Sequence, residues 1–411
     1  MSKLKILQLC KKFPYPIKDG EVIGIINLTI GFHFHGHSTT VLALNTLKHF
    51  FKPDQLLTDI SKIAIFKAQT IDTSINIKDA FLNLFTQQSY NVERFYSSDY
   101  EASIYDEILN GDFDVVLLEG IYLMRYIRCI RKAIAARKTG MKIPVVIQRP
   151  QNVEFVIWER LAESESNFLK KIYLRFLAKR MKQFEIKNIN QADVLIPVSQ
   201  VDLDIFKAHG CTLPSTAIPT GYVFDTLSEI DVDKEKKAVA FIGGMDWMPN
   251  KDGVNWFLNE VWPIIIKAQP DAEFYLAGRN FPESLHSLKA KGVKVLGEVE
   301  DAKSFVKSYS ISIVPLFAGS GMRVKIIESM AWGRAVVSTS VGAESIAYTQ
   351  DKDIKIADNA QEFADAIIAL LTNESLRKRM GENAQELIKS KYDNKLIAQK
   401  ILDFAITNSN Q

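Results

Sequence analysis

Residues 317–339 read FAGSGMRVKIIESMAWGRAVVST, and this stretch decides how the surrounding chain is expected to fold. The apolar run ISIVPLF (311–317) that leads into it is typical of a buried strand, and the β-branched run at its end predicts another strand. Between the two lie a glycine-rich turn, a short helix and a glycine at which the helix ends. The order strand, loop, helix, strand is the unit from which parallel sheets are built.

Similar apolar runs recur along the whole chain, each followed by a longer amphipathic stretch. Strands without polar alternation are covered on both faces, as in a parallel sheet with helical crossovers. We therefore expect an α/β protein with Rossmann-like, doubly wound sheets. The expected strands are 4–10, 39–45, 114–120, 143–148 and 192–199 in the first half, and 238–244, 272–278, 293–299, 311–317 and 335–341 in the second.

The length of 411 residues predicts two domains, because one ordinary core does not grow so large. The series of strands pauses over residues 221–237, which end in the polar sequence DVDKEKK. We place the first domain at 1–220, the second at 221–390 and a C-terminal helix at 391–411. Residues 46–110 show no clear pattern, and we expect this range to hold an insertion in the first domain.

Composition and charge narrow the functional class. A formal net charge of +3 is nearly balanced and gives no reason to expect a nucleic-acid partner. Cys10, Cys129 and Cys211 have no metal-binding or CxxC spacing, which suits a reducing compartment. The N-terminal apolar run is too short for a signal peptide, and no window reaches the ~18 apolar residues of a spanning helix. We expect a cytoplasmic protein, or one held peripherally at the inner membrane face.

The glycine-rich loop has the residues of an anion site. It follows a strand and starts a helix, where open α/β sheets bind ligands and where N–H groups attract negative charge. Gly319 and Gly321 allow close approach, and Arg323 and Lys325 supply two cations suited to a diphosphate. Glu328 can accept hydrogen bonds from ribose hydroxyls. These residues predict a nucleotide-diphosphate site, although a plain turn with a Lys–Glu surface pair explains the same letters.

Several segments resemble the retaining GT-B glycosyltransferases of group 1, or family four, and most closely a subgroup with a GMR-x-K signature. In the second half they are GMRVKIIESMAWGRAVVST (321–339), FIGGMDWMPNKDGVNWFLNEVWPII (241–265), YLAGRN (275–280) and VSTSVGAESI (337–346). In the first half FPYPIKDG (13–20), RPQNVEFVIWER (149–160) and VSQVD (198–202) resemble the acceptor-side pattern more loosely.

The resemblance implies two Rossmann-like domains facing across a cleft, with a last helix that returns to the first domain. It also implies sugar transfer from a nucleotide sugar to a saccharide or lipid-linked acceptor, with retention of configuration and without a metal. The first domain would receive the acceptor and the second would bind the donor, in the synthesis of a surface polysaccharide. Two alternatives stay open: a nucleotide-sugar-binding pseudo-enzyme, and a nucleotide-sugar epimerase of the same architecture.

The candidate site residues follow from the loop chemistry and the resemblance together. The catalytic candidates are Arg323, Lys325 and Glu154, of which Glu154 has a plain helix-start carboxylate as its alternative. The donor-binding candidates are Gly20, Gly244, Arg279, Gly319, Ser320, Gly321, Met322, Glu328, Gly342, Ala343 and Glu344, and the acceptor-side candidates are Gln151 and Asn152.

The chain departs from the family pattern at three places. The first of the family's two glutamates falls at Ser320. The usual cations of the donor domain fall near Met245 and Asn250, and we expect the two loop cations to replace them. Many relatives have a histidine at Gln151, and a glutamine there can bind a hydroxyl but cannot carry a proton.

Two remaining patterns each have two interpretations. His33, His35 and His37 occupy alternate positions, as ligands of a metal could, but they lie at the predicted end of a helix, where cations are favoured. We interpret these histidines, and the scattered DxD pairs, as ordinary surface groups. We expect no metal and no other cofactor. The basic amphipathic stretch 167–187 fits a helix packed on its own core, or a helix that lies on an anionic membrane.

Overall fold

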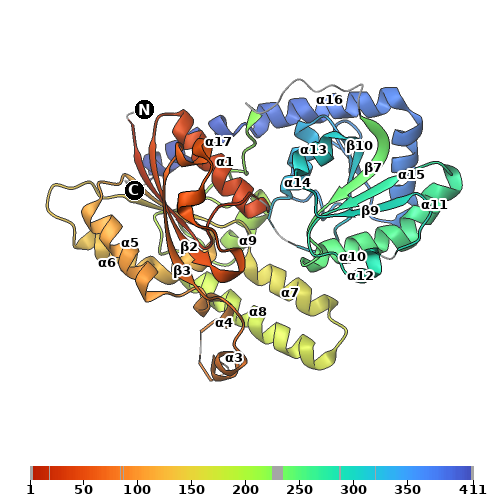
Figure 1. Cartoon of the computed structure of the whole chain (residues 1–411). Coiled ribbons are helices and arrows are strands. Elements are labelled where there is room, and N and C mark those ends of the chain that lie inside the picture. The colour runs from red at the N-terminus through yellow and green to blue at the C-terminus, as the bar shows by residue number, and fades with distance from the viewer. Residues whose placement is uncertain are drawn as a thin grey trace. The chain divides into compact units, whose positions relative to one another are not determined.

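The computed structural model describes residues 3–17, 19–83, 85–86, 88–224, 235–286, 288–319 and 321–408. The chain divides into two compact units, each built around its own sheet (Figure 1). Unit 1 holds residues 1–221 and 394–411, and unit 2 holds residues 222–393. The C-terminal helix therefore returns to unit 1, which confirms that part of the expected fold.

Unit 1 contains a six-stranded parallel sheet in the order β3-β2-β1-β4-β5-β6. Apart from the exposed Lys5 at the start of β1, the central strands β1 and β4 are buried because helices cover both faces, which explains their apolar runs. The strands are β1 (Lys5–Cys10), β2 (Ser38–Thr46), β3 (Ile65–Ile71), β4 (Val115–Glu119), β5 (Val145–Arg149) and β6 (Val194–Leu195).

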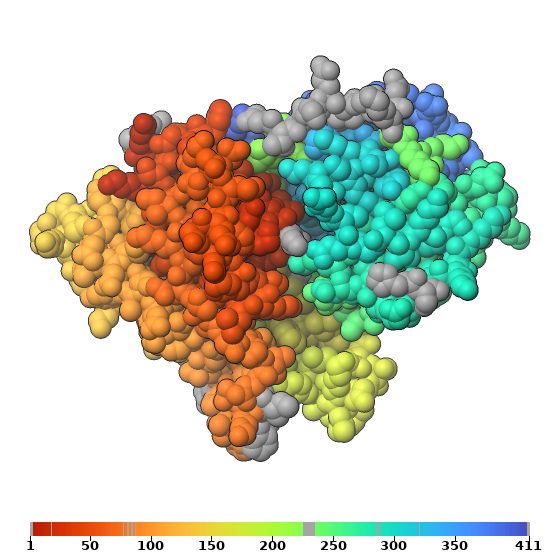
Figure 2. Space-filling view, viewed as in Figure 1, coloured from red at the N-terminus to blue at the C-terminus, as the bar shows by residue number. Residues whose placement is uncertain are grey.

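The helices of unit 1 form a layer on each face of the sheet. Leu28 and Phe32 of α1 and Ile401 of α17 pack on one face, and Tyr100 and Ile104 of α5 pack on the other. The hairpin of α7 and α8 forms a projection at the lower edge of the surface in Figure 2. The helices are α1 (Gly20–Phe34), α2 (Thr58–Ser61), α3 (Ile77–Asn83), α4 (Tyr90–Glu93), α5 (Ser98–Asn110), α6 (Ile127–Ala135), α7 (Glu154–Ser164), α8 (Phe168–Asn188), α9 (Gln200–Ala208) and α17 (Asn394–Asn408).

Residues 46–110 contain two regular elements of the first domain that the sequence did not reveal. This segment contributes β3 to the sheet, pairing in parallel with β2, and α5 to one of its faces. β3 is an edge strand whose side chains are all partly or fully exposed, so it does not show the apolar run of a central strand.

Unit 2 contains a second six-stranded parallel sheet, in the order β12-β11-β10-β7-β8-β9. Two edge residues that the sequence did not reveal, Lys355 and Ile356, form β12. The strands are β7 (Lys236–Ile242), β8 (Phe274–Ala277), β9 (Val293–Gly297), β10 (Tyr309–Val314), β11 (Ala335–Ser338) and β12 (Lys355–Ile356). The helices are α10 (Met248–Trp256), α11 (Trp262–Ala268), α12 (Glu283–His286), α13 (Ala302–Lys307), α14 (Val324–Ala331), α15 (Ala360–Thr372) and α16 (Glu374–Lys391).

The strand order of each sheet creates a switch point, where neighbouring strands lead into helices on opposite faces. In unit 2 this point lies between β7 and β10, so the loops after these two strands flank it. The glycine-rich loop at 317–323 follows β10 and starts α14. The fold thus brings this loop to the place where doubly wound sheets bind their ligands.

The chain crosses between the units twice, at residues 221–222 and 393–394, and the two crossings lie side by side. In unit 1, a Cβ on Gly221 would stand 2.6 Å from the Cα of Asn394. In unit 2, the N–H of Tyr222 donates to the carbonyl of Tyr392 at 2.6 Å. Unit 2 is therefore inserted into unit 1 with its two ends in contact. Most of the expected linker, residues 225–234, lies outside the described residues.

Candidate functional site

The loop between β10 and α14 is built on two glycines with left-handed backbone, Gly319 (φ 120°) and Gly321 (φ 74°). Arg323 stands at the N-cap of α14, is 7% exposed, and donates from Nη1 to the carbonyl of Gly321 at 3.1 Å. Its guanidinium also lies over the Trp247 ring, 5.5 Å from the centroid. Arg323 thus fixes the shape of the loop. Ser320 lies outside the described residues.

Lys325 reaches from α14 to the loop that follows β7, across the switch point. Its Nζ donates to Oδ1 of Asn250 at 2.9 Å, and Nδ2 of Asn250 donates to the carbonyl of Gly244 at 2.8 Å. A Cβ on Gly243 would stand 2.8 Å from the same Nζ. Burial lowers the pKa of Lys325 to about 7, with a further lowering from Arg323. The lysine is therefore a partly buried amine beside backbone, and not one half of a surface pair.

Glu328, one turn further along α14, is also held away from bulk water. Burial raises the pKa of its carboxyl group to about 7, while Lys303 and Lys325 oppose this shift. Lys303 belongs to the start of α13, which the sequence analysis did not connect with the site. The fold therefore brings a third segment, the beginning of α13, close enough to Glu328 to act on its charge.

The loops after β7 and β8 are joined through their backbones. The N–H of Gly243 donates to Ala277 O at 3.0 Å, and the N–H of Met245 donates to Arg279 O at 2.9 Å. Gly278 has a φ of 145°, and a Cβ there would lie 1.9 Å from the carbonyl oxygen of Gly243. Only glycine fits where the two loops come this close. This explains the glycines of GG (243–244) and GRN (278–280) in the sequence.

Arg279 and Gly244, two of the donor candidates, are brought together by this pairing. A Cβ on Gly244 would stand 3.8 Å from Nη2 of Arg279 and 2.6 Å from Oδ1 of Asp246. The arginine side chain is partly buried, so its charge lies beside the glycine loop. Met245 is buried in the core of unit 2, so its position carries no group that could meet a ligand.

The loop after β11 is tied to the glycine-rich loop. Oγ of Ser345 donates to the carbonyl of Gly321 at 2.9 Å, a contact that the sequence analysis missed. The N–H of Gly342 donates to Oγ1 of Thr339 at 3.0 Å. Ala343 is fully buried and Met322 packs against the same cluster, so both act here as packing residues. Glu344, next to Ser345, is partly buried.

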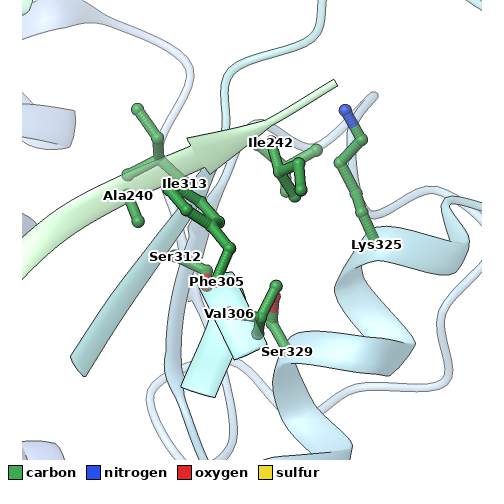
Figure 3. Close-up of a pocket in the computed structure, with 9 residues that line it drawn as sticks. Ala240, Ile242, Phe305, Val306, Ser312, Ile313, Lys325 and Ser329 are labelled. Carbon is green, nitrogen blue, oxygen red and sulfur yellow. The ribbon is translucent and has the colours of Figure 1, made fainter. Parts of the chain in front are cut away.

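A small cavity lies behind Lys325, with room for about one water molecule. Figure 3 shows Lys325 rising from α14 beside Ile242, with Ser329 one turn further along the helix. The cavity is far too small for a nucleotide.

In unit 1, Gln151 is held by a buried carboxylate. Nε2 of Gln151 donates to Oε2 of Glu119 at 2.8 Å, and Nε2 of Gln8 donates to its Oε1 at 2.9 Å. Glu119 is fully buried at the end of β4, and burial raises the pKa of its carboxyl group, although Arg149 opposes this. The amide of Gln151 is thus fixed with its nitrogen toward Glu119. Asn152 follows in the turn before α7 and is partly buried.

Glu154 is the first residue of α7 and accepts a hydrogen bond from the Tyr122 hydroxyl at 3.1 Å. The backbone N–H groups of Glu154 and Phe155 donate to the carboxyl group of Glu185, at 3.2 and 2.7 Å. Glu185, from α8, is fully buried and was missed by the sequence analysis. Burial, then the neighbouring Glu154, raises the pKa of Glu185 well above its usual range.

Gly20 is the exposed first residue of α1, and Asp19 caps this helix by accepting from Val22 N at 3.1 Å. Nζ of Lys12 binds the cap, 2.8 Å from Asp19 Oδ2 and 3.2 Å from Glu21 Oε2. The start of α1 thus carries the Lys12 ammonium beside the carboxylates of Asp19 and Glu21.

Two of the three clustered histidines take part in local packing, while His33 is exposed. His37 Nδ1 accepts from the N–H of Leu4 at 3.1 Å, and His35 Nε2 lies 2.9 Å from the carbonyl oxygen of Lys395. Across the described ranges, no three His, Cys, Asp or Glu side chains come together as a metal site would require. In the same part of the chain no helix is both long enough and apolar enough to cross a membrane.

Residues 236–373 match the family model described as Glycosyl transferases group 1. An uncharacterized 44.6 kDa protein in the cps region of Klebsiella pneumoniae is 27% identical over 71% of this chain and 74% of its own length. A phosphatidyl-myo-inositol mannosyltransferase of Mycobacterium leprae is 28% identical over 45% of this chain. That match spans 51% of the mannosyltransferase, about half of its length.

Solved structures share the architecture of the whole chain. HepE of Anabaena in complex with UDP has a TM-score of 0.67 and 14% identity, covering 98% of this chain and 100% of its own. Sucrose-phosphate synthase of Thermosynechococcus elongatus has a TM-score of 0.69 and 14% identity, covering 98% and 99%. At such identities the likeness shows the fold, two Rossmann-like domains with parallel sheets.

Proposed function

We propose that this chain, a glycosyltransferase of the GT-B type, transfers a sugar from a nucleotide-sugar donor to a saccharide or lipid-linked acceptor. Retention of configuration and independence of metal are part of the proposal. Support for the donor comes from the group 1 match over residues 236–373 and from the UDP held by HepE, a protein of the same fold.

One observation carries the donor assignment: the ammonium group of Lys325 lies beside Asn250 and Gly243. In the group 1 pattern a cation falls near Asn250; this chain has an asparagine at that position and the exposed Lys251 directly after it. Lys325 of α14 places its ammonium group beside Asn250. The amine next to the glycine loop is therefore our candidate for binding the diphosphate.

The proposed chemistry is electrostatic. As the bond between sugar and diphosphate breaks, negative charge grows on the phosphate, and the protonated Lys325 and the N–H groups at the start of α14 stabilise it. Glu328 accepts hydrogen bonds from the ribose, while Arg323 holds the loop in the required shape. Removing one such preorganised group typically costs ~2.7–4 kcal/mol of transition-state stabilisation.

The biological setting is proposed from the relatives of the chain. The Klebsiella relative is encoded in a cps region, and the mycobacterial relatives act on a phosphatidyl-inositol, which favour a surface saccharide or a lipid-linked acceptor. We accordingly propose action at the cytoplasmic face of a membrane, with peripheral contact through residues 167–187.

The first test is thermal stabilisation by UDP, GDP and ADP in the presence of EDTA. One nucleotide should stabilise the wild type, by about 2.7 kcal/mol when it is present at 100 times its Kd. Glu328→Ala should lose this effect, whereas Glu386→Ala, at an exposed position on α16, should keep it. If none of the three nucleotides stabilises the wild type, the donor site and the proposed function are wrong.

Gln151 favours a second candidate, a nucleotide-sugar-binding protein without transferase activity. Its amide is bound to Glu119 and offers no group that could carry a proton. In retaining transfer the leaving diphosphate can take the acceptor proton, so the amide alone does not decide. Release of the nucleotide diphosphate, with membrane extract as acceptor, separates the two. Nucleotide binding without any turnover would establish the binding protein.

A further inference from the structure

A series of buried polar side chains crosses the core of unit 1 and ends at Gln151. Oγ1 of Thr29 on α1 donates to Oε1 of Gln8 at 2.8 Å, and Nε2 of Gln8 donates to Oε1 of Glu119 at 2.9 Å. Nε2 of Gln151 donates to the other carboxylate oxygen, Oε2, at 2.8 Å. Thr29, Gln8 and Glu119 are fully buried. We call these four residues the Glu119 network.

The Glu119 network lies in the middle of a sheet whose other central side chains are mostly apolar. Glu119 is the last residue of β4 and pairs in register with Cys10 at the end of β1. A buried carboxylate loses its hydration, and apolar side chains of similar volume often stabilise a core equally well or better. Filling the core therefore does not explain a carboxylate at this position.

The neighbouring arginine does not explain Glu119 either. Arg149 is the register partner of Glu119 on β5, but its guanidinium is bound to backbone. Nη1 of Arg149 donates to the carbonyl of Ile218 at 3.0 Å, and Nη2 donates to the carbonyl of Pro219 at 3.0 Å. Within the described part of the chain, the hydrogen bonds that Glu119 accepts through its side chain come from the two glutamine amides. The carboxylate therefore holds the amides in place.

Glu119 determines which end of the Gln151 amide faces the core. An ionised carboxylate offers only acceptors, so it binds the NH₂ end of the amide and rejects the carbonyl end. Nε2 is therefore turned inward, and Oε1 is held on another side, toward α1. A Cβ on Gly24 of this helix would stand 3.8 Å from Oε1. Gln151 itself is partly exposed, so a ligand can approach it.

The amide oxygen is held at the switch point of the first sheet. β1 and β4 are neighbours there, and the helices that follow them pack on opposite faces, with Leu28 of α1 on one and Ile130 of α6 on the other. Doubly wound sheets bind their ligands at such a point. The Glu119 network thus joins the buried part of β1 and β4 to a polar group at the ligand-binding edge of unit 1.

We propose that Glu119 is a positioning residue, which holds the Gln151 amide so that its oxygen accepts a hydrogen bond from a substrate hydroxyl. This role rests on the proposed function, because that function supplies a saccharide with hydroxyl groups. Fixing the amide in advance reduces the entropy lost when the substrate is bound. Glu119 is fully buried, so it acts through Gln151 and does not touch the substrate.

An imidazole at position 151 measures the effect of Glu119 directly, because its ring can donate one N–H and its pKa reports nearby charge. Gln151→His adds one imidazole to the six histidines of the chain, and NMR can follow its titration. Its pKa should be at least about one unit higher than in the double variant Glu119→Gln, Gln151→His. The neutral ring should keep a single tautomer only when Glu119 is present. The other charged groups near Glu119, Arg149 of β5 and Glu21 of α1, are the same in both proteins.

Turnover is the second measurement. Glu119→Gln should slow the release of nucleotide diphosphate, with membrane extract as acceptor, by at least about tenfold. Stabilisation by the nucleotide should stay unchanged, because the proposed donor loops belong to unit 2. Gln8→Met removes one of the two hydrogen bonds to Glu119 and should cause a smaller loss. Gln148→Leu is the matched control: it changes another fully buried glutamine of the same sheet, whose amide has no hydrogen bond among the described residues, and should turn over like the wild type.

Equal imidazole pKa values with and without Glu119, or full turnover by Glu119→Gln, would overturn the proposal. A lower melting temperature with no change in either measurement would assign the Glu119 network to stability alone. If Glu119→Gln does not fold, Gln8→Met replaces it in both measurements, and a response in neither would likewise overturn the proposal.

The imidazole titration needs neither nucleotide nor acceptor, so its result is independent of the proposed function. If the imidazole responds to Glu119 but no nucleotide stabilises unit 2, the donor assignment fails and the positioning of residue 151 stands. If a nucleotide stabilises unit 2 but the imidazole does not respond, only the positioning role fails.

Discussion

Lys325 and Glu328 lie three residues apart on α14, and burial moves the pKa of both groups to about 7. For Lys325 this favours the neutral amine, and for Glu328 the neutral acid. A bound diphosphate would favour the charged lysine, and ribose hydroxyls would favour the charged carboxylate. On the proposed function, donor binding should therefore be coupled to the protonation of both groups close to neutral pH.

We expect donor affinity to follow a bell-shaped pH profile with its maximum near pH 7. Below the pKa of Glu328 the carboxylate is lost, and above the pKa of Lys325 the ammonium is lost, each limb changing affinity by at most about tenfold per pH unit. Calorimetric titration with the nucleotide sugar whose base passes the stabilisation test gives the profile. Glu328→Gln should remove the acid limb and Lys325→Met the alkaline limb. A flat wild-type profile would show that neither group meets the ligand.

Gly278 offers a separate test of the paired loops. Gly278→Ala places a Cβ against the Gly243 carbonyl and strains a backbone with φ 145°, whereas Gly140→Ala strains a φ of 92° in open space. Denaturation by urea should show a loss of about 1–2 kcal/mol for Gly140→Ala, from strain alone. Gly278→Ala should lose at least twice as much, because the loops must also move apart. Equal losses would mean that the loop contact is easily relaxed.

At the scale of elements, the strands that the sequence predicts are the buried ones. Central strands such as β1 and β4 were predicted because both faces are covered, which leaves an uninterrupted apolar run. β3 and β12 were missed because one is a half-exposed edge strand and the other has only two residues. The glycine loops were found from their composition. The Lys325–Asn250 bond, between residues 75 positions apart, depends on tertiary packing and leaves no local pattern.

Glu185 shows how one element can hold another, since this α8 side chain accepts from the first two N–H groups of α7. Its raised pKa means that the folded state keeps a proton that the unfolded state releases above its ordinary pKa. The stability of the wild type should therefore fall as pH rises from the unfolded value toward the folded one.

We predict that Glu185→Gln removes this dependence. As pH rises above about 5, the unfolding free energy of the variant relative to wild type should increase, by at most about 1.4 kcal/mol per pH unit, until the folded-state pKa of Glu185 is passed. Thermal melts across this range measure it. Glu386→Gln, at an exposed position, should show a constant difference. A constant difference for Glu185→Gln as well would mean that Glu185 titrates alike in both states.

At the scale of the whole molecule, α17 completes the core of unit 1 although it follows unit 2 in the sequence. Ile401 and Leu402 are fully buried there, together with Phe32 of α1. A Cβ on Gly31 would stand 2.6 Å from the Cβ of Ala398, so the two helices cross at close range. The last residues of the chain thus stabilise the sheet formed by the first.

Ile401→Ala should therefore destabilise unit 1 by about 2–5 kcal/mol, the usual cost of a cavity in a core. Hydrogen exchange should accelerate in β1 and β4 more than in β7 and β10. Leu396→Ala, on the same helix but 41% exposed, should change stability by less than about 0.5 kcal/mol. Equal acceleration in both sheets would show that the two units unfold as one.

The paired passages between the units have a consequence for recombination. Because Tyr222 and Tyr392 touch, and Gly221 lies against Asn394, residues 222–393 begin and end at one place. A gene segment coding for them can be exchanged as a cassette. Its two junctions lie side by side, so the exchange leaves the core of unit 1 intact. Chimeras cut at these junctions should inherit their nucleotide preference from the cassette and their acceptor preference from the host.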